Sequence, residues 1–340
     1  MRTLEPSVEV VEFTPTPEQY AWTFGGVAPV ARVRPGTALR LWSDDAFCGR
    51  LRSVTDLASA SLQMPYVNPQ TGPFFVEGAE PGDTLVLHVV DVEPARSWGA
   101  SALIPYFGGL TSTDRTATLQ PPLPERTWIY EVDSAARTVT FASGEFSLPL
   151  PIEPMLGTVG VAPAAGEVRS SLVPDSFGGN MDTPELGPGT TVYLRVNVEG
   201  ALFSLGDGHY RQGEGESCGT AVEGAVNSLV VVELLKARSG VVAPAWPRLE
   251  SDAHWTVVGS ARPLEDAWRV GQVEAVAWLG ELTGLDTLDA YQLLSQISEV
   301  PLANAVDVNY SVATKIPKRL LPTTVAAYGG VHERMRALTR

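Results

Sequence analysis

Up to about residue 245 the chain consists of short runs of apolar, β-branched and aromatic residues that are separated by turn residues. Proline–glycine turns, such as Pro35-Gly36 and Pro81-Gly82, stand directly before several of these runs. Short runs bounded by such turns are typical of β-strands, and their density favours a β-sandwich or a barrel. The strand candidates are Leu39–Trp42, Thr84–Val92, Thr127–Val132, Arg137–Phe141, Thr190–Val198 and Ser228–Leu235.

After about residue 250 the apolar residues recur at the spacing of a helix. They do so between Leu264 and Leu282, and Gly284 follows as a residue that ends helices. A second helix is predicted to begin at Asp286 or Thr287, either of which can cap it, and to end before Pro301. Two amphipathic helices after a strand-rich segment indicate helices packed on one face of a sheet.

The pattern therefore predicts a mainly β fold with a smaller α+β region at the C-terminal end. We place a β-rich body that carries the polar clusters at residues 1–245, and an α+β region with two helices at residues 246–340. No segment resembles a flexible linker, so the division depends only on the change of period.

Composition and charge exclude several classes of function. Of the 340 residues, 44% are hydrophobic and 19% are charged, which is enough to bury a sizeable core and excludes dominant disorder. The net charge of −15 repels phosphate backbones and anionic lipids, so we expect no nucleic-acid or membrane partner. No apolar run approaches the roughly 20 residues of a membrane helix, and the first residues lack the layout of a signal peptide.

Lysine and cysteine usage narrows the chemistry further. The only lysines are Lys236, Lys315 and Lys318. The chain therefore lacks the upstream catalytic lysine that amide hydrolases with a Ser–Ser–Lys or Cys–Glu–Lys arrangement require. Cys48 and Cys218 are too few for a disulfide framework or a cysteine-based zinc site. We expect two free thiols in a cytoplasmic protein.

The densest polar segment contains Asp207 and His209, which are two positions apart around Gly208. On an extended chain this spacing places both side chains on one face. A carboxylate next to an imidazole provides either two ligands for a zinc-like ion or an acid–base pair. The alternative is a turn in which Asp207 caps its own backbone and His209 is exposed.

A second cluster repeats this spacing with Asn180 and Asp182, which follow a pair of glycines. Oxygen ligands at alternate positions suit a hard or borderline cation, although an Asx-turn between strands explains the same pattern. Further carboxylates are available at Glu80, in a rigid proline-rich segment, and at Asp45, which follows a predicted strand. Both can also be solvated side chains of surface loops.

Taken together, these segments resemble the acetamidase/formamidase family of small-amide hydrolases. The similar segments occur in the same order as in the family and cover about residues 25 to 320. They are Asn68-Pro69 with Thr71-Gly72-Pro73, Val76–Asp83, Gly157–Pro163, Gly178–Asp182, Gly200–His209, Gln212-Gly213, Gly215-Glu216, Ala221–Glu223, Asp289–Tyr291 and Ile316–Lys318.

The resemblance implies a mostly β fold with jelly-roll-like sandwich parts, assembled into homo-oligomers of two or more copies. It also implies hydrolysis of formamide, acetamide or similar small neutral amides to ammonia and a carboxylate, with a bound divalent metal ion. Zinc is favoured, and calcium is the alternative, because one histidine among oxygen ligands fits either.

Amide hydrolysis requires an activated water, a polarised carbonyl and a proton donor for the leaving nitrogen. We predict that Asp207 and His209 bind the metal, and that Asp182 and Asp45 complete its ligands. Asn180 is predicted to ligate the metal or to orient the amide.

Either Glu80 or Glu223 is predicted to accept the proton of the water and to return it to the ammonia. Two alternatives from other classes remain open at this point. One is a hydrolase that uses Cys218 as its nucleophile, and the other is a non-catalytic β-domain that binds a small ligand.

Overall fold

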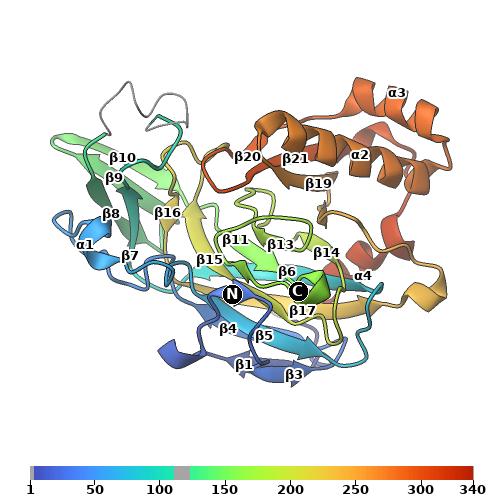
Figure 1. Cartoon of the computed structure of the whole chain (residues 1–340), viewed down its shortest axis with the longest axis horizontal. Helices are drawn as coiled ribbons and strands as arrows, with labels where there is room; N and C mark the ends of the chain where they lie inside the picture. Colours follow the sequence, from blue (N-terminus) through green and yellow to red (C-terminus); the bar gives the residue numbers. More distant parts are fainter. Residues whose placement is uncertain (1–3, 111–122, 340) are drawn as a thin grey trace.

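A computed structural model describes residues 4–110 and 123–339 of the chain. Two large β-sheets make up most of the molecule, and two helices cover one end of the first sheet (Figure 1). The predicted mainly β fold with a C-terminal helical region is therefore confirmed. No helix in the described ranges has both the length and the apolar character that crossing a membrane requires.

The first sheet has nine strands and extends through both parts of the chain. Its middle strand β14 pairs with β6 on one side and with β18 on the other, so strands before and after residue 245 belong to one sheet. In spatial order the strands are β1 (Val10–Phe13), β4 (Ala38–Ser43), β17 (Val226–Leu235), β6 (Thr84–Pro94), β14 (Thr191–Arg195), β18 (Arg248–Glu250), β19 (His254–Ala261), β21 (Tyr310–Pro317) and β20 (Leu302–Asn304).

The second sheet has ten strands, and β15 lies at its branch point. Strand β15 pairs with β11 and β16, and also with β5, which in turn pairs with β3. The strands are β10 (Phe146–Pro151), β9 (Thr138–Ser143), β8 (Arg126–Asp133), β7 (Trp98–Leu103), β16 (Val222–Glu223), β15 (Phe203–Arg211), β11 (Met155–Gly160), β13 (Gly178–Asn180), β5 (Gln70–Val76) and β3 (Ala31–Val33). Strands β2 (Thr23–Phe24) and β12 (Arg169–Ser170) form a separate pair.

The hydrophobic core lies between these two sheets. Strands β4, β6 and β17 face β5 and β15, and side chains such as Leu39, Phe74 and Leu205 are completely buried between them. Alternate positions of β4 point into this core, as expected for a strand with one face against another sheet. The sandwich that the strand pattern predicts is therefore present.

The two predicted helices are α2 (Leu264–Thr283), which packs on β19 and β21, and α3 (Thr287–Ile297), which packs on α2 and β21 (Figure 1). Gly284 ends α2 with a φ of 76°, and the Asp286 carboxylate caps α3 by accepting from two backbone amides. Trp278 on α2 and Trp255 on β19 are buried in the core that the helices form with the sheet.

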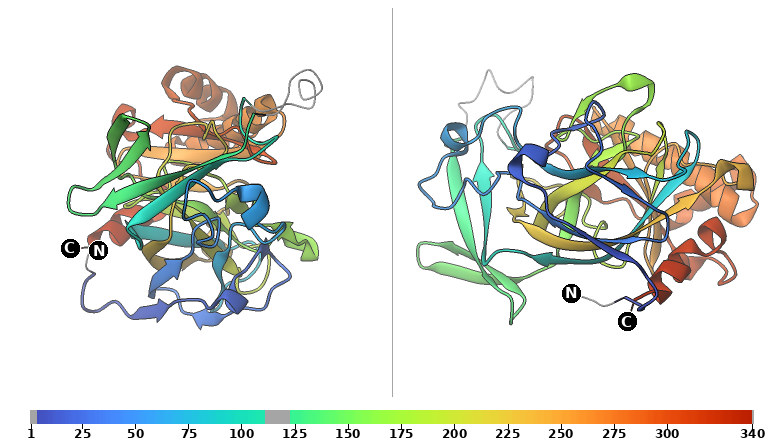
Figure 2. Two further views of the ribbon diagram at one scale, coloured as in Figure 1. Left: turned by 90° about the vertical axis from the view of Figure 1, so that its left-hand side faces the viewer. Right: turned by 90° about the horizontal axis from the view of Figure 1, so that it is seen from below.

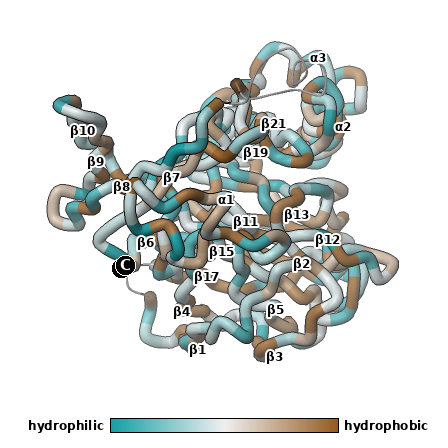
Figure 3. The backbone as a smooth tube through the Cα atoms, turned by 60° about the vertical axis from the view of Figure 1, so that its left-hand side comes forward, coloured by the Kyte–Doolittle hydropathy of each residue, from teal (hydrophilic) through white to brown (hydrophobic). Residues whose placement is uncertain are grey.

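A third core covers the outer face of the first sheet. Helix α4 (Val331–Ala337) packs there on β6 and β17 through Val331 and Met335. The two ends of the described chain lie side by side, where Leu4 bridges to Thr339 (Figure 2). Strands β8, β9 and β10 project from the body as an antiparallel ribbon near the short helix α1 (Ala58–Ser61) (Figures 1 and 3).

Candidate functional site

Strands β15 and β16 bring three of the predicted residues together. On β15, Asp207 Oδ1 lies 3.5 Å from His209 Nε2, and both side chains are buried. Strand β16 runs antiparallel to β15 with Glu223 directly opposite His209, so that Glu223 Oε2 lies 3.1 Å from the same nitrogen. Two carboxylates, one from each strand, thus converge on one imidazole nitrogen.

The second polar cluster of the sequence reaches the same place from β13. Asp182 follows β13, and its Oδ1 lies 3.9 Å from His209 Nε2. Asn180 donates hydrogen bonds from Nδ2 to Asp182 Oδ2 at 2.7 Å and to Asp307 Oδ2 at 2.6 Å. The predicted association of the Asp-Gly-His and Asn-Met-Asp segments is therefore present in the structure.

Two overlapping groups of side chains have the spacing of metal ligands. One consists of Asp182, Asp207 and His209, and the other of His209, Glu216 and Glu223. Within each group, one potential ligand atom per residue lies within 4.8 Å of the others, and all five side chains are buried.

The tautomer of His209 follows from its neighbour Gln212. The Gln212 Nε2 group donates to the backbone oxygens of Asp182 and Ala303, so its Oε1 faces His209 Nδ1 at 2.9 Å. Because an amide oxygen only accepts, Nδ1 must carry a proton, and neutral His209 directs the lone pair of Nε2 at the carboxylates. Lone pair and carboxylates repel unless a proton or a metal cation lies between them.

The cluster also contains acceptors that the protein does not satisfy. Asp182 Oδ1 and Glu223 Oε2 are buried and have no hydrogen-bond partner among the described residues. A buried carboxylate oxygen without a donor is costly, and a bound cation removes that cost. This donor set of one imidazole and several carboxylates fits a zinc-like ion.

Gly157 on β11 leaves the space in which these groups meet. A Cβ atom at this position would lie 2.5 Å from Asp182 Oδ1, 2.6 Å from Asp207 Oδ2 and 3.0 Å from His209 Cε1. Any side chain at Gly157 would therefore displace the carboxylates.

Burial and the neighbouring charges raise the pKa values of several groups in this cluster. Burial, and then the neighbouring Glu216 and Asp307, raise the pKa of Asp182 well above its ordinary value. Burial likewise raises the pKa of Glu216, of Glu223 and of Asp307, the last to about 6. Burial alone would lower the pKa of His209, but Glu223 and Asp207 outweigh it and raise that pKa well above its ordinary value.

Carboxamide side chains hold the carboxylates in place. Asn68 donates from Nδ2 to Asn180 Oδ1 at 2.8 Å and to Asp207 Oδ2 at 3.2 Å. Asn304, at the end of β20, donates to Asp182 Oδ2 and to Asp307 Oδ2, both at 2.7 Å. Neutral donors thus stabilise three carboxylates without neutralising them.

The backbone is strained at several positions of this site. Residues with a side chain rarely adopt a positive φ, yet four site residues do so. They are Asn68 (59°), Asp182 (44°), Asp207 (60°) and Glu216 (46°). Such strain concentrates where the geometry of side chains matters more than local stability.

These polar groups line a small cavity of about 70 Å³. Apolar side chains line the rest of it. They are Phe47, Val67, Ile104, Phe107 and Leu172. Pockets for drug-sized ligands measure about 300 to 1,000 Å³, so this cavity suits only a very small molecule with a polar and an apolar end.

Comparison with known proteins agrees with this geometry. The model of the acetamidase/formamidase family matches residues 21–166 and 148–322, which together make up most of the chain. The chain belongs to this family.

A crystal structure of an acetamidase from Yersinia enterocolitica has the same fold. The two chains are 39% identical, superpose with a TM-score of 0.86, and cover 93% of this chain and 94% of the other. The match therefore extends over nearly the whole of both chains.

Two curated relatives are more distant. An acetamidase from Mycolicibacterium smegmatis is 26% identical over 56% of this chain, and a formamidase from Methylophilus methylotrophus is 28% identical over 61%. The matches span 59% and 61% of those proteins, so the chain covers about three-fifths of the length of the curated relatives it matches.

Within this acetamidase/formamidase fold, two of the predicted site residues lie outside the cluster. Glu80 is exposed and forms an ion pair with Lys236 at 2.7 Å. Asp45 is buried, but its carboxylate accepts hydrogen bonds from Arg96 and from the backbone amides of Phe47 and Gly49. Neither carboxylate is directed at His209 Nε2.

Several residues that complete the site carry no signal in the sequence. Asn304 is the last residue of β20 and Asp307 follows it, in a stretch where no spacing of polar residues distinguishes them from a loop. Asn68, Gln212 and Glu216 lie in the family-like segments, but nothing in their local pattern indicates which side chains point inward.

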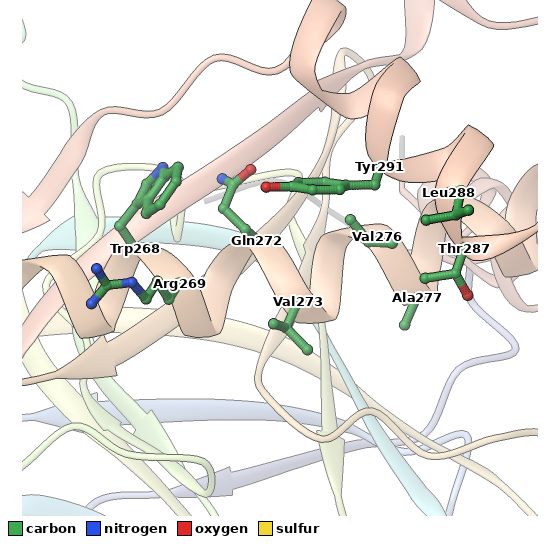
Figure 4. A pocket seen from close by; sticks show the side chains of 9 residues that line it. All are labelled: Trp268, Arg269, Gln272, Val273, Val276, Ala277, Thr287, Leu288 and Tyr291. Atoms are coloured by element: carbon green, nitrogen blue, oxygen red, sulfur yellow. The ribbon is translucent and has the colours of Figure 1, made fainter.

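A larger groove lies between α2 and α3 and has a different character. It measures about 500 Å³ and is lined mainly by apolar side chains, among them Trp268, Val273, Leu288 and Tyr291 (Figure 4). The residues that line it include no histidine and no carboxylate. The groove therefore lacks the groups that amide hydrolysis needs.

Proposed function

We propose that this protein hydrolyses short aliphatic amides to ammonia and a carboxylate. The observation that carries the proposal is the buried cluster in which His209 Nε2 lies 3.1 to 3.9 Å from three carboxylates, beside a very small cavity. Membership of the acetamidase/formamidase family and the names of the relatives support the same reaction.

We propose that Asp182, Asp207 and His209 hold a divalent metal ion, with Glu216 and Glu223 on its other side. Zinc is the proposed ion and calcium the alternative, because the donor set contains one imidazole and otherwise oxygen. A metal ion bound there would lower the pKa of a water molecule to about 7 and polarise an amide carbonyl.

Glu223 is the proposed general base. Its Oε1 accepts from the backbone amide of Ala221, while Oε2 lies 3.1 Å from His209 Nε2, has no hydrogen-bond partner among the described residues and is available to a proton. The protonated carboxyl can then donate to the departing nitrogen, so one residue takes a proton from water and returns it to ammonia. Glu80 is too exposed, and too firmly paired with Lys236, for this role.

Asn180 is proposed to position the carboxylates and not to bind the amide. Its Oδ1 accepts from Asn68, and its Nδ2 donates to Asp182 and Asp307. Since these bonds occupy both ends of the carboxamide, it has little capacity left for a substrate.

Ammonia release from formamide, acetamide, propionamide and urea tests the proposed reaction. We expect release from the short amides, loss of that release after chelation, and recovery when zinc is added. His209→Ala should abolish turnover and lower the metal content together. Turnover that survives complete chelation would contradict the proposed metal dependence.

A matched pair of variants distinguishes the two glutamates. Glu223→Gln keeps the shape of the side chain but removes the base, and we expect kcat to fall by roughly 10²- to 10⁴-fold. Glu80→Gln should leave kcat within about twofold of the wild type. Equal activities in the two variants would contradict the role of Glu223.

The structure weakens the alternative in which Cys218 is the nucleophile. Burial and the neighbouring Glu216 raise the pKa of the Cys218 thiol, whereas a nucleophilic cysteine requires a lowered pKa. Treatment with a thiol reagent should therefore leave ammonia release unchanged. The alternative of a binding domain without catalysis would show stabilisation by amides and no ammonia.

The homo-oligomer and the cytoplasmic location stay predictions. Two cysteines that form no disulfide support a reducing compartment. Light scattering of the purified protein gives the molar mass directly, and we expect at least twice the 36.3 kDa of one chain.

A further inference from the structure

A second and larger cavity, called the outer cavity below, shares lining residues with the reaction cavity, which is called the inner cavity. The outer cavity measures about 270 Å³, and Tyr106, Arg262 and Tyr310 are among the residues that line it. Phe107 and Asp307 line both cavities. Asp307 is held by Asn180 and Asn304, and the Phe107 ring is the apolar side chain that the two cavities share.

Contacts between two loops fix the position of Phe107. A Cβ at Gly219 would lie 2.5 Å from Phe107 Cδ1, and a Cβ at Gly108 would lie 2.6 Å from the Cys218 backbone oxygen. Gly109 also donates a hydrogen bond to the Ser217 backbone oxygen at 2.9 Å. The segment that carries Phe107 therefore packs directly against the segment that carries Glu216.

The walls of the inner cavity orient a small amide. Its lining combines carboxylates and carboxamides, which suit the polar amide group, with the apolar side chains of Phe47, Ile104, Leu172 and Phe107. The acyl chain of a bound amide must contact these apolar side chains, because unpaired polar groups are costly there. A longer acyl chain would need space on the far side of Phe107.

We infer that the outer cavity is the entrance to the site and that Phe107 limits the length of the acyl chain. This inference depends on the proposed amide hydrolysis. With the ring in place, the space for the acyl chain ends within the inner cavity. Without it, the inner and outer cavities join, and the chain can extend between Tyr106 and Tyr310.

The test compares Phe107→Ala and Phe107→Leu with the wild type on formamide, acetamide, butyramide and hexanamide. We expect the ratio of kcat/KM for hexanamide to that for acetamide to rise at least about tenfold in Phe107→Ala, and less in Phe107→Leu. Val308→Ala is the control, since Val308 lines only the outer cavity and is 57% exposed. An unchanged ratio in both Phe107 variants, or an equal rise in Val308→Ala, would overturn the inference.

Thermal stabilisation by the same amides separates this inference from the proposed function. Hexanamide should raise the melting temperature of Phe107→Ala and not that of the wild type, whether or not ammonia is released. If no amide is hydrolysed but this difference in melting temperature is present, the proposed hydrolysis is wrong and the role of Phe107 in limiting the acyl chain is supported. If amides are hydrolysed and neither measurement depends on Phe107, the inference fails alone.

Discussion

Gly157 is the residue whose missing side chain makes the site possible. The carboxylates of Asp182 and Asp207 and the His209 ring approach it so closely that even one methyl group would collide with them. The arrangement of the cluster thus depends on a residue that has no side chain. At the residue scale, the proposed function depends on how closely these groups approach Gly157 as much as on their charges.

This leads to a prediction for Gly157→Ala. The added methyl group should push the carboxylates apart and lower the metal affinity by at least about tenfold, while the fold is retained. Elemental analysis of metal content, together with far-UV circular dichroism, measures both. Gly213→Ala is the control, because a Cβ at Gly213 meets no atom within 4 Å. Full metal content in Gly157→Ala would contradict the proposed ligands.

At the scale of elements, the helices and the strands owe their positions to different causes. Helix α3 begins where Asp286 accepts from the amides of Leu288 and Asp289, which is a local interaction. Strand β15 is positioned by its neighbours on both sides, β11 and β5 among them, which are distant in the sequence. The helix ends are therefore visible in the sequence, whereas strand order is not.

The local cap gives a second prediction. Asp286→Ala should lower the free energy of unfolding by about 1 kcal/mol, because two amides at the start of α3 lose their acceptor. Urea denaturation measures this loss. Asp286→Asn retains an acceptor and should cost clearly less, and equal losses in the two variants would show that the cap is not the cause.

At the scale of the whole molecule, the site joins parts that the sequence separates. Asn180 comes from β13 and His209 from β15 of the second sheet, while Asn304 comes from β20 of the first sheet and Asp307 from the segment that follows it. Several acidic side chains are buried where these parts meet. A bound cation would offset their repulsion, so its loss should weaken the molecule as a whole.

We therefore predict that chelation lowers the melting temperature of the wild type, by on the order of 5 °C, and that added zinc restores it. Differential scanning calorimetry measures the change. The same treatment should have little effect on Gly157→Ala, which is expected to bind the metal weakly. A wild-type melting temperature that does not respond to chelation would count against a structural contribution of the metal.

The sequence by itself determined the features that depend on neighbours along the chain. Strand runs bounded by turns predicted the β-rich body, and the period of 3.6 with Gly284 and Asp286 predicted both ends of α2 and the start of α3 nearly to the residue. The spacing of two between Asp207 and His209 likewise indicated side chains that act together. These features follow from local steric and hydrogen-bonding rules.

Only the tertiary structure decided which carboxylates meet. Glu80 and Glu223 are equal candidates in the sequence, yet one is paired with Lys236 at the surface and the other lies opposite His209. Asn304 shows no signal in its own segment and still donates to Asp182 across the fold. Strand pairing between distant segments sets these neighbours, and the burial that shifts their pKa values exists only once the sheets have packed.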